Sequence, residues 1–382
     1  MNKIYLDANG GTKPYPEVID IIIDVLTNHW GNPGAVYELG DNARNIINIA
    51  TQIVSGDINC NKNEIVWTSS ATESNVMAIV GVLNAHPHMQ FLTTKLEHSS
   101  IIETVKHLDG HPAFFLKNDN KGFVDLNCLD QKLHDVSRCC GNNFLVSVSG
   151  ANSEIGTKQN IKEISKIVHN YGGIFHTDCS QLFTEQPINV KDNNIDLMTL
   201  SGQKIHAGHG CGVLYIKNGV KIQPIIYGKQ QNELRGSTLP THLIAAFGKA
   251  LEITRKNNPY NKISLLRNRL LNKLMTVRGV RLNGPEINEG RLYNNINLTI
   301  DGVNSDSLVT RCSLLGVYLN KGAVCQSYDA KPSETLKAIG LSDVDAFNTI
   351  RISLDQFNTE AEIDIATDVI IKMIEQIRQT NN

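Results

Sequence analysis

The 382-residue sequence lacks the features that mark several common classes of protein. No apolar run approaches the ~20 residues that a membrane-spanning helix needs, and residues 1–7 do not have the pattern of a signal peptide. The formal net charge is only -2, which gives no reason to expect a broad nucleic-acid-binding surface. We therefore expect a cytoplasmic protein that contacts neither membranes nor nucleic acid directly.

The cysteines also lack the spacings of a metal site or a disulfide framework. There is no CxxC pair and no repeated zinc-type spacing, so we expect no metal and mostly reduced thiols in or near the core. A cysteine with a chemical role must therefore be singled out by its surroundings. The eight are Cys60, Cys128, Cys139, Cys140, Cys179, Cys211, Cys312 and Cys325.

Internal repeats and low-complexity segments are absent as well, and the length suggests two or three domains. Strand-like and helix-like segments alternate through the first two thirds of the chain. This alternation predicts a mostly parallel sheet with helices on both faces. The strand candidates lie at residues 64–68, 91–94, 113–116, 144–148, 173–176, 196–200 and 212–216.

The pattern changes after about residue 255, where a smaller α+β domain is predicted. A long amphipathic helix is expected near 259–277, and further helices near 305–315, 332–339 and 360–379. Short strands are expected at 280–282, 295–300, 317–319 and 349–354.

The stretch from His176 to Lys204 carries the strongest chemical signal. Asp178 ends one apolar run, and Lys204 follows the next run by a few residues. A pyridoxal 5'-phosphate (PLP) site needs such a pair, because the lysine forms a Schiff base and the aspartate keeps the pyridinium nitrogen protonated. The alternatives are a helix cap for Asp178 and a solvated surface position for Lys204.

Two other segments can each be interpreted either as part of a chemical site or as ordinary structure. Ser70, Ala71 and Thr72 lie between a strand and a helix, where backbone N–H groups form a phosphate site or simply a capped helix start. Cys325 lies in a glycine-containing loop, either as a small buried hydrophobe or as a mobile thiol able to ionise.

The order of these motifs resembles the cysteine desulfurases, in the class V aminotransferase group of fold-type I PLP-dependent enzymes. The resemblance runs from Tyr5-Leu6-Asp7 to residues 358–364, nearly the whole chain. It implies an α/β fold with a mostly parallel seven-stranded sheet in a large PLP-binding domain, residues 16–255. Residues 1–15 and 256–382 would form the small α+β domain that carries the active-site cysteine loop.

The resemblance also implies a role for each matching residue. Ser-Gly-Gln-Lys at 201–204 is similar to the family's Ser-Gly-His-Lys, which makes Lys204 the Schiff-base lysine. His98 would stack on the cofactor ring and take part in proton transfer, and Thr238 would reach the phosphate from the second subunit of a homodimer. The implied cofactor-binding residues are Ala71, Thr72, His98, Asp178, Gln181, Ser201, Gln203, Lys204 and Thr238.

On the substrate side, the resemblance implies an L-cysteine desulfurase in which Cys325 is the nucleophile. Arg351 would bind the substrate carboxylate, and Asn152 and Ser153 would contact the substrate. The products would be L-alanine and a persulfide on Cys325. The sulfur would pass to an acceptor protein for iron–sulfur assembly, tRNA thiolation or DNA phosphorothioation.

Some positions depart from the usual desulfurase sequence. Gln203 and Ser153 replace a His and an Asn, Asp355 replaces a Gly, and residues 7–12 and 235–238 differ in order or composition. These departures bear on substrate preference and on the sulfur acceptor. The alternatives are a selenocysteine lyase or other C–S lyase, a transaminase or epimerase in which Cys325 is incidental, and an inactive dimeric scaffold.

Overall fold

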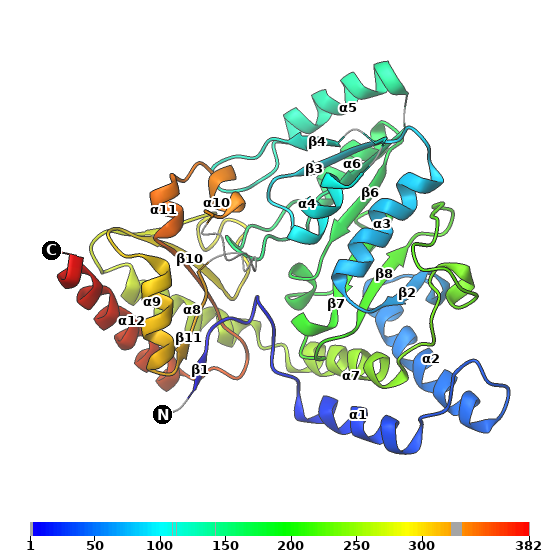
Figure 1. The fold of residues 1–382 in the computed structure, drawn as a ribbon, viewed down its shortest axis with the longest axis horizontal. Coiled ribbons are helices and arrows are strands. Elements are labelled where there is room, and N and C mark those ends of the chain that lie inside the picture. Colours follow the sequence, from blue (N-terminus) through cyan, green and yellow to red (C-terminus); the bar gives the residue numbers. More distant parts are fainter. Residues whose placement is uncertain (1–2, 109, 112, 142, 322–330, 382) are drawn as a thin grey trace.

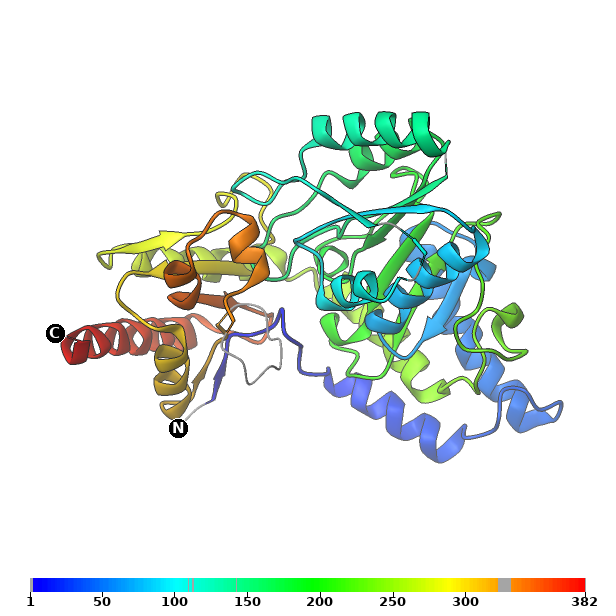
Figure 2. The same cartoon turned by 45° about the horizontal axis from the view of Figure 1, so that its top comes forward.

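The computed structural model describes residues 3–108, 110–111, 113–141, 143–321 and 331–381. Cys325, the predicted nucleophile, lies outside these described residues. A large sheet with its helices forms one half of the molecule, and a smaller group of strands and helices forms the other (Figure 1). Figure 2 shows the same two halves from a second direction.

The large half is built on a seven-stranded sheet with the strand order β2-β8-β7-β6-β5-β3-β4. Every neighbouring pair from β7 to β4 is parallel, and only β8 runs against both of its neighbours. The predicted mostly parallel seven-stranded sheet is confirmed. Its strands are β2 (Ile65–Thr68), β3 (Gln90–Thr94), β4 (Ala113–Leu116), β5 (Phe144–Ser147), β6 (Ile174–Asp178), β7 (Leu197–Ser201) and β8 (Gly212–Ile216).

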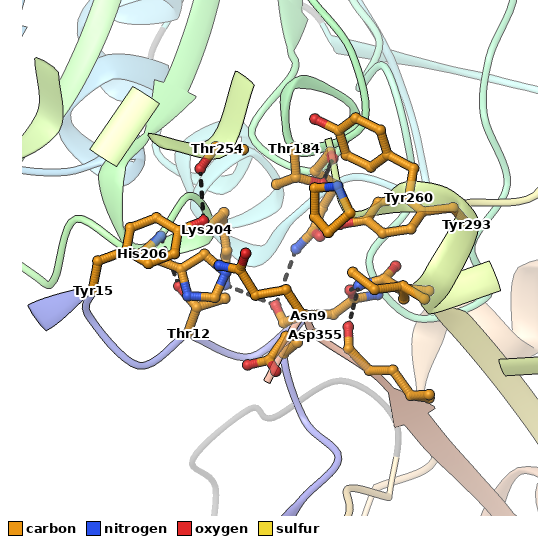
Figure 3. A pocket seen from close by; sticks show the side chains of 17 residues that line it. Asn9, Thr12, Tyr15, Thr184, Lys204, His206, Thr254, Tyr260, Tyr293 and Asp355 are labelled. Atoms are coloured by element: carbon orange, nitrogen blue, oxygen red, sulfur yellow. Dashed lines mark hydrogen bonds between the residues drawn. The ribbon is translucent and has the colours of Figure 1, made fainter. Parts of the chain in front are cut away.

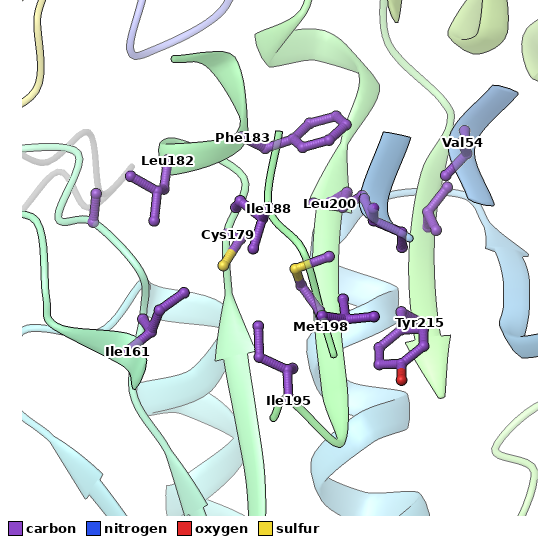
Figure 4. Close-up of a cluster of buried hydrophobic side chains, with 14 of the residues drawn as sticks. Val54, Ile161, Cys179, Leu182, Phe183, Ile188, Ile195, Met198, Leu200 and Tyr215 are labelled. Atoms are coloured by element: carbon purple, nitrogen blue, oxygen red, sulfur yellow. The ribbon is translucent and has the colours of Figure 1, made fainter. Parts of the chain in front are cut away.

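Alternate residues of these strands pack on opposite faces of the sheet, as the period of two requires. In β7, Leu197 belongs to the cluster under α3 and α4, whereas Met198 and Leu200 belong to the larger cluster on the other face. Figure 4 shows Met198 and Leu200 in that larger cluster with Cys179 and Phe183. Because both faces are covered, the strands are buried along their whole length and mostly apolar, with buried polar residues such as His176 and Thr199 among them.

The helices of the large half lie on the two faces of this sheet. Helix α7 packs against both α1 and α2, and α3 packs against α4 and the sheet. The helices are α1 (Pro16–Asn28), α2 (Glu38–Ile58), α3 (Ala71–Ala85), α4 (Ser99–Lys106), α5 (Leu126–Cys140), α6 (Ile161–Asn170) and α7 (Thr241–Asn257).

The smaller half contains an antiparallel sheet of order β12-β10-β9 and the parallel pair β1–β11. The N-terminal residues Ile4 and Leu6 are buried in the same core as Ile350 and Leu270, so the two ends of the chain share one core. The exact domain limits stay a prediction. The elements are β1 (Ile4–Tyr5), α8 (Tyr260–Leu274), β9 (Val280–Leu282), β10 (Asn295–Ile300), α9 (Ser305–Leu314), β11 (Val317–Tyr318), α10 (Glu334–Ala338), α11 (Asp343–Phe347), β12 (Thr349–Ser353) and α12 (Glu360–Asn381).

Some predicted boundaries move by a few residues for visible reasons. Strand β6 extends to Asp178 because that residue still pairs with Thr199 of β7. Helix α10 begins only after Ser333, whose hydroxyl caps it by accepting from Leu336 N. Within the described ranges, none of the helices combines the length and apolarity that crossing a bilayer would need.

Candidate active site

The carboxyl ends of the parallel strands meet at one edge of the large sheet, where ligands of open α/β sheets usually bind. A pocket of about 270 Å³ opens there and faces β12 of the smaller half. The structure brings eleven predicted site residues together around it, but Thr238 is exposed and does not line it. The eleven are Ala71, Thr72, His98, Asn152, Ser153, Asp178, Gln181, Ser201, Gln203, Lys204 and Arg351.

Lys204 ends the short helical turn η3 (Gly202–Lys204), which directly follows β7. Its Nζ donates to the backbone oxygens of Asn9, at 2.7 Å, and Gly10, at 2.8 Å. Figure 3 shows Lys204 beside Asn9 in a second, smaller cavity that adjoins the pocket. Burial lowers the pKa of Lys204 to about 8, the Arg351 charge lowers it further, and Asp7 and Asp178 oppose them. The amine is therefore partly unprotonated near neutral pH, as a nucleophile must be.

Asp178 is the last residue of β6 and is held from two sides. Its Oδ1 accepts from Ser180 N at 2.9 Å, and its Oδ2 accepts from Asn75 Nδ2 at 2.8 Å. The contact to Ser180 shows that Asp178 does stabilise the turn after the strand. The contact to Asn75 fixes the carboxylate in the pocket wall.

Helix α3 begins at the pocket. The Ser70 hydroxyl accepts from Glu73 N and caps the helix, while Ala71 and Thr72 in the first turn line the pocket. A helix start of this kind presents backbone N–H groups that favour an anion. Glu73 is also paired with Arg235 at 2.7 Å, which ties the loop carrying Thr238 to this end of the helix.

His98 precedes α4, and its side chain is exposed over the pocket. The Nδ1 atom lies 2.8 Å from the hydroxyl of Ser100 and accepts from Ser100 N at 3.1 Å. Desolvation by the surrounding protein lowers the pKa of His98. The Asp178 charge raises this pKa, and the Lys204 charge lowers it. The rest of the side chain stays accessible from the pocket.

Arg351 reaches the pocket from β12 and pairs with Asp7 at 2.6 Å between Nη2 and Oδ1. Its Nη1 approaches Ser153 O at 3.5 Å, and its buried Nε has no hydrogen-bond partner among the described residues. The guanidinium is therefore buried, oriented and not fully satisfied. A carboxylate in the pocket would complete its hydrogen bonding.

Asn152 shapes the loop that carries Ser153. Its Oδ1 accepts from Glu154 N at 2.8 Å and Ile155 N at 2.9 Å, and its Nδ2 donates to Leu96 O at 2.7 Å. Most of its hydrogen-bonding capacity is thus used inside the loop.

Gln203 is likewise engaged with its surroundings. Its Oε1 lies 2.7 Å from His209 Nδ1, and its backbone oxygen accepts from Thr12.

Sequence reasoning missed four residues that the structure places around the predicted ones. Asn75 and Ser100 lie one or two residues from quoted motifs, so their position along the chain was a usable signal. Asp7 belongs to a quoted motif but carried no predicted role. Asn9 gave no signal, because its partner Lys204 lies 195 positions away.

Comparison with known proteins agrees with this geometry. A family model described as aminotransferase class-V matches residues 4–365. Cysteine desulfurase IscS of Clostridium botulinum is 37% identical over 388 aligned residues, which cover 99% of this chain and 96% of the relative. A solved NifS-like protein has a TM-score of 0.89 at 27% identity and covers 98% of this chain and 100% of its own. A structure described as SspA in complex with cysteine has a TM-score of 0.79 at 27% identity, covering 93% and 100%. The chain belongs to the aminotransferase class-V family.

Proposed function

We propose that this protein is a PLP-dependent L-cysteine desulfurase. The main observation behind the proposal is that one pocket brings together Lys204, Asp178, Arg351 and the start of α3. Curated relatives of nearly the same length are cysteine desulfurases, and one solved relative is described with cysteine bound.

The side chains around the pocket fit PLP. Lys204, with its pKa lowered to about 8, suits attachment to the cofactor aldehyde. The fixed carboxylate of Asp178 suits the ring nitrogen, and the first turn of α3 suits the phosphate. Ser201 and Gln203 line the same pocket and would add phosphate contacts, and Gln181 would face the ring hydroxyl.

When bound, PLP supplies an electron sink for the substrate's carbon atoms. Lys204 moves protons at Nζ, since its pKa lets it both release and accept them near neutral pH. With PLP bound, the Asp178 carboxylate would face the ring nitrogen, and the His98 ring would stack on the cofactor ring. Arg351 orients L-cysteine by its carboxylate with two donors of the guanidinium fork.

The sulfur step requires a second thiol, which we assign to Cys325. The Cys325 thiolate attacks the substrate sulfur, so an S–S bond forms as the C–S bond breaks. The carbon left behind takes a proton and leaves as L-alanine, and Cys325 keeps the sulfur as a persulfide. Atoms and electrons balance without an external oxidant or reductant.

We assign the working enzyme as a homodimer that passes its persulfide sulfur to an acceptor protein. Support for the dimer comes from the loop that carries Thr238, which does not reach the pocket of its own chain. The same loop exposes Tyr227, and Val36 before α2 is 95% exposed.

The decisive experiment is incubation with L-cysteine while alanine and protein persulfide are measured together. We expect both products in equal amounts in the first turnover. A Cys325→Ala variant should keep the cofactor's visible absorbance and make no persulfide. Pyruvate instead of alanine, or alanine at an undiminished rate from Cys325→Ala, would contradict the proposal. Faster turnover of selenocysteine than of cysteine would favour a selenocysteine lyase.

A further inference from the structure

A chain of buried hydrogen bonds joins the two catalytic side chains Asp178 and His98. Asn75, on α3, donates from Nδ2 to Asp178 Oδ2 at 2.8 Å and to Ser100 Oγ at 2.9 Å. The Ser100 hydroxyl in turn lies 2.8 Å from His98 Nδ1. Asn75 is completely buried and Ser100 nearly so, so water does not compete for these bonds.

The direction of every hydrogen bond in this chain can be assigned. If the amide of Asn75 were reversed, its oxygen would face a carboxylate oxygen of Asp178 at 2.8 Å, with no proton between them. The Asn75 nitrogen therefore donates to both partners. Since Ser100 Oγ accepts from Asn75, its own proton is free to point at His98.

The remaining contact settles the protonation of His98 Nδ1. Ser100 N donates to this atom at 3.1 Å, and a backbone N–H cannot accept. Two donors therefore converge on Nδ1, which must keep its lone pair, and the ring proton lies on Nε2. Among the described residues, no hydrogen bond to Nε2 is present, and the ring lies over the pocket.

Asn75 is not explained by packing alone. Its Oδ1 is buried without a hydrogen-bond partner in the described part of the chain, which costs free energy. A leucine of similar size would avoid that cost. The benefit that offsets it is the pair of donated bonds.

We propose that Asn75 is a positioning residue which, through Ser100, holds His98 as the neutral tautomer protonated on Nε2. His98 then offers the pocket an N–H group at Nε2 and a stacking face. This inference rests on the proposed function only for what faces His98 in the pocket. The tautomer itself can be measured with no cofactor or substrate present.

The test is nitrogen NMR of the full-length protein with 15N-labelled histidine, with His98 assigned from a His98→Gln variant. We expect the shift of an unprotonated nitrogen for Nδ1 and of a protonated one for Nε2, without and with PLP. In Ser100→Ala the backbone N–H still donates to Nδ1 but the hydroxyl does not, so the two shifts should move toward each other without merging, and Ser100→Thr should restore the full separation. Ser74→Ala is the matched control, because it removes a buried hydroxyl of α3 that bonds to Thr68 of β2 and takes no part in the Asp178–Asn75–Ser100–His98 hydrogen bonds.

A double-variant comparison tests whether Asn75 acts through Ser100. Asn75→Leu should move the His98 shifts in the wild-type background and add nothing in Ser100→Ala. A protonated Nδ1 in the wild-type protein would overturn the inference, and so would additive effects of the two substitutions. If Asn75→Leu does not fold, the His98 shifts of Ser100→Ala and Ser100→Thr alone test the proposed tautomer. Loss of desulfurase activity with normal shifts would count against the proposed function but not against the tautomer.

Discussion

Lys204 is the residue whose ionisation should control attachment of the proposed cofactor. Its pKa is lowered to about 8 by burial, so the protonated fraction falls as the pH rises from 7 to 9. Only the free amine attacks an aldehyde. We expect the rate at which PLP binds the cofactor-free protein to rise over this range and to level above pH 9. Absorbance after rapid mixing measures it. A rate that is flat or falls across this interval would contradict the lowered pKa.

Glu97, next to His98, links stability to pH. It is fully buried, which raises its pKa to about 7 despite hydrogen bonds from Ser149 and Thr94. The native state therefore holds the proton more tightly than the unfolded chain, and stability is greatest below the unfolded pKa and falls as the pH rises toward 7. The loss amounts to about 3 kcal/mol.

Urea unfolding at pH 5 and pH 8 tests this linkage. Glu97→Gln cannot ionise, so its free energy of unfolding should change less between the two pH values, by about 3 kcal/mol. Glu103→Gln is the control, because Glu103 is exposed in an ion pair with Lys106 and should behave as the wild type does. If the free energy of unfolding changed equally between pH 5 and pH 8 in Glu97→Gln and the wild type, the raised pKa of Glu97 would be disproved.

The sequence predicted these site residues unevenly, for a physical reason. Lys204 and Asp178 were found because each follows an apolar run that must be a buried strand, so its place at the sheet edge follows from topology. Asn75 and Asn9 contact Asp178 and Lys204 across more than one hundred residues, so no local pattern encodes these contacts, although the place of Asn75 just after the 70–72 motif marked it as near the site.

At the scale of elements, the N-terminal segment contacts β12 of the smaller sheet and stabilises it. Asp7 bridges to Ser353 of β12 and pairs with the buried guanidinium of Arg351. Removing the carboxylate leaves that charge without its partner. We expect Asp7→Ala to lower the free energy of unfolding by about 3 kcal/mol, whereas Asp7→Asn keeps an acceptor and should lose less.

Chemical denaturation of the two variants measures this difference. Asp306→Ala is the matched control in the same half of the molecule, since Asp306 forms an exposed pair with Lys321. Such a pair contributes about 0.5 kcal/mol. Similar losses for Asp7→Ala and Asp306→Ala would show that the Arg351 pair is no more than a surface contact.

Elements were predicted well where burial made a pattern and less well at their ends. All seven strands of the large sheet fall within two residues of the predicted runs, because strands covered on both faces are rich in apolar residues. The helix predicted at 259–277 ends at Leu274, where the chain turns toward β9. The reversed direction of β8 depends on a short connection after Lys204 and is not encoded in the hydrophobic pattern of the strand.

At the scale of the whole molecule, the position of Thr238 makes a prediction about assembly. The loop is held to its own chain by the Arg235–Glu73 pair, yet Thr238 lies away from the pocket of that chain. We expect light scattering to give twice the mass of one chain. A Thr238→Ala subunit and a Lys204→Ala subunit, each defective alone, should regain activity when they form mixed dimers.

Complementation of this kind is possible only if one site takes residues from both chains. In a mixed dimer, one of the two sites then has an intact Lys204 and an intact partner Thr238. A monomer in solution at working concentrations, or mixed dimers no more active than the parents, would refute the shared site.

Asn9 has all four of its polar groups engaged, and they connect the two halves of the molecule. Its backbone N–H and Oδ1 bond to Ser353 and Asn294 of the smaller half, and its Nδ2 bonds to Ser153 of the larger. Its backbone oxygen holds the amine of Lys204. A hinge motion between the halves would therefore stretch or compress this hydrogen bond to the Lys204 amine. The position of the Lys204 amine thus depends on how far the two halves of the molecule are closed. Any motion that opens the cleft would also move this amine within the pocket.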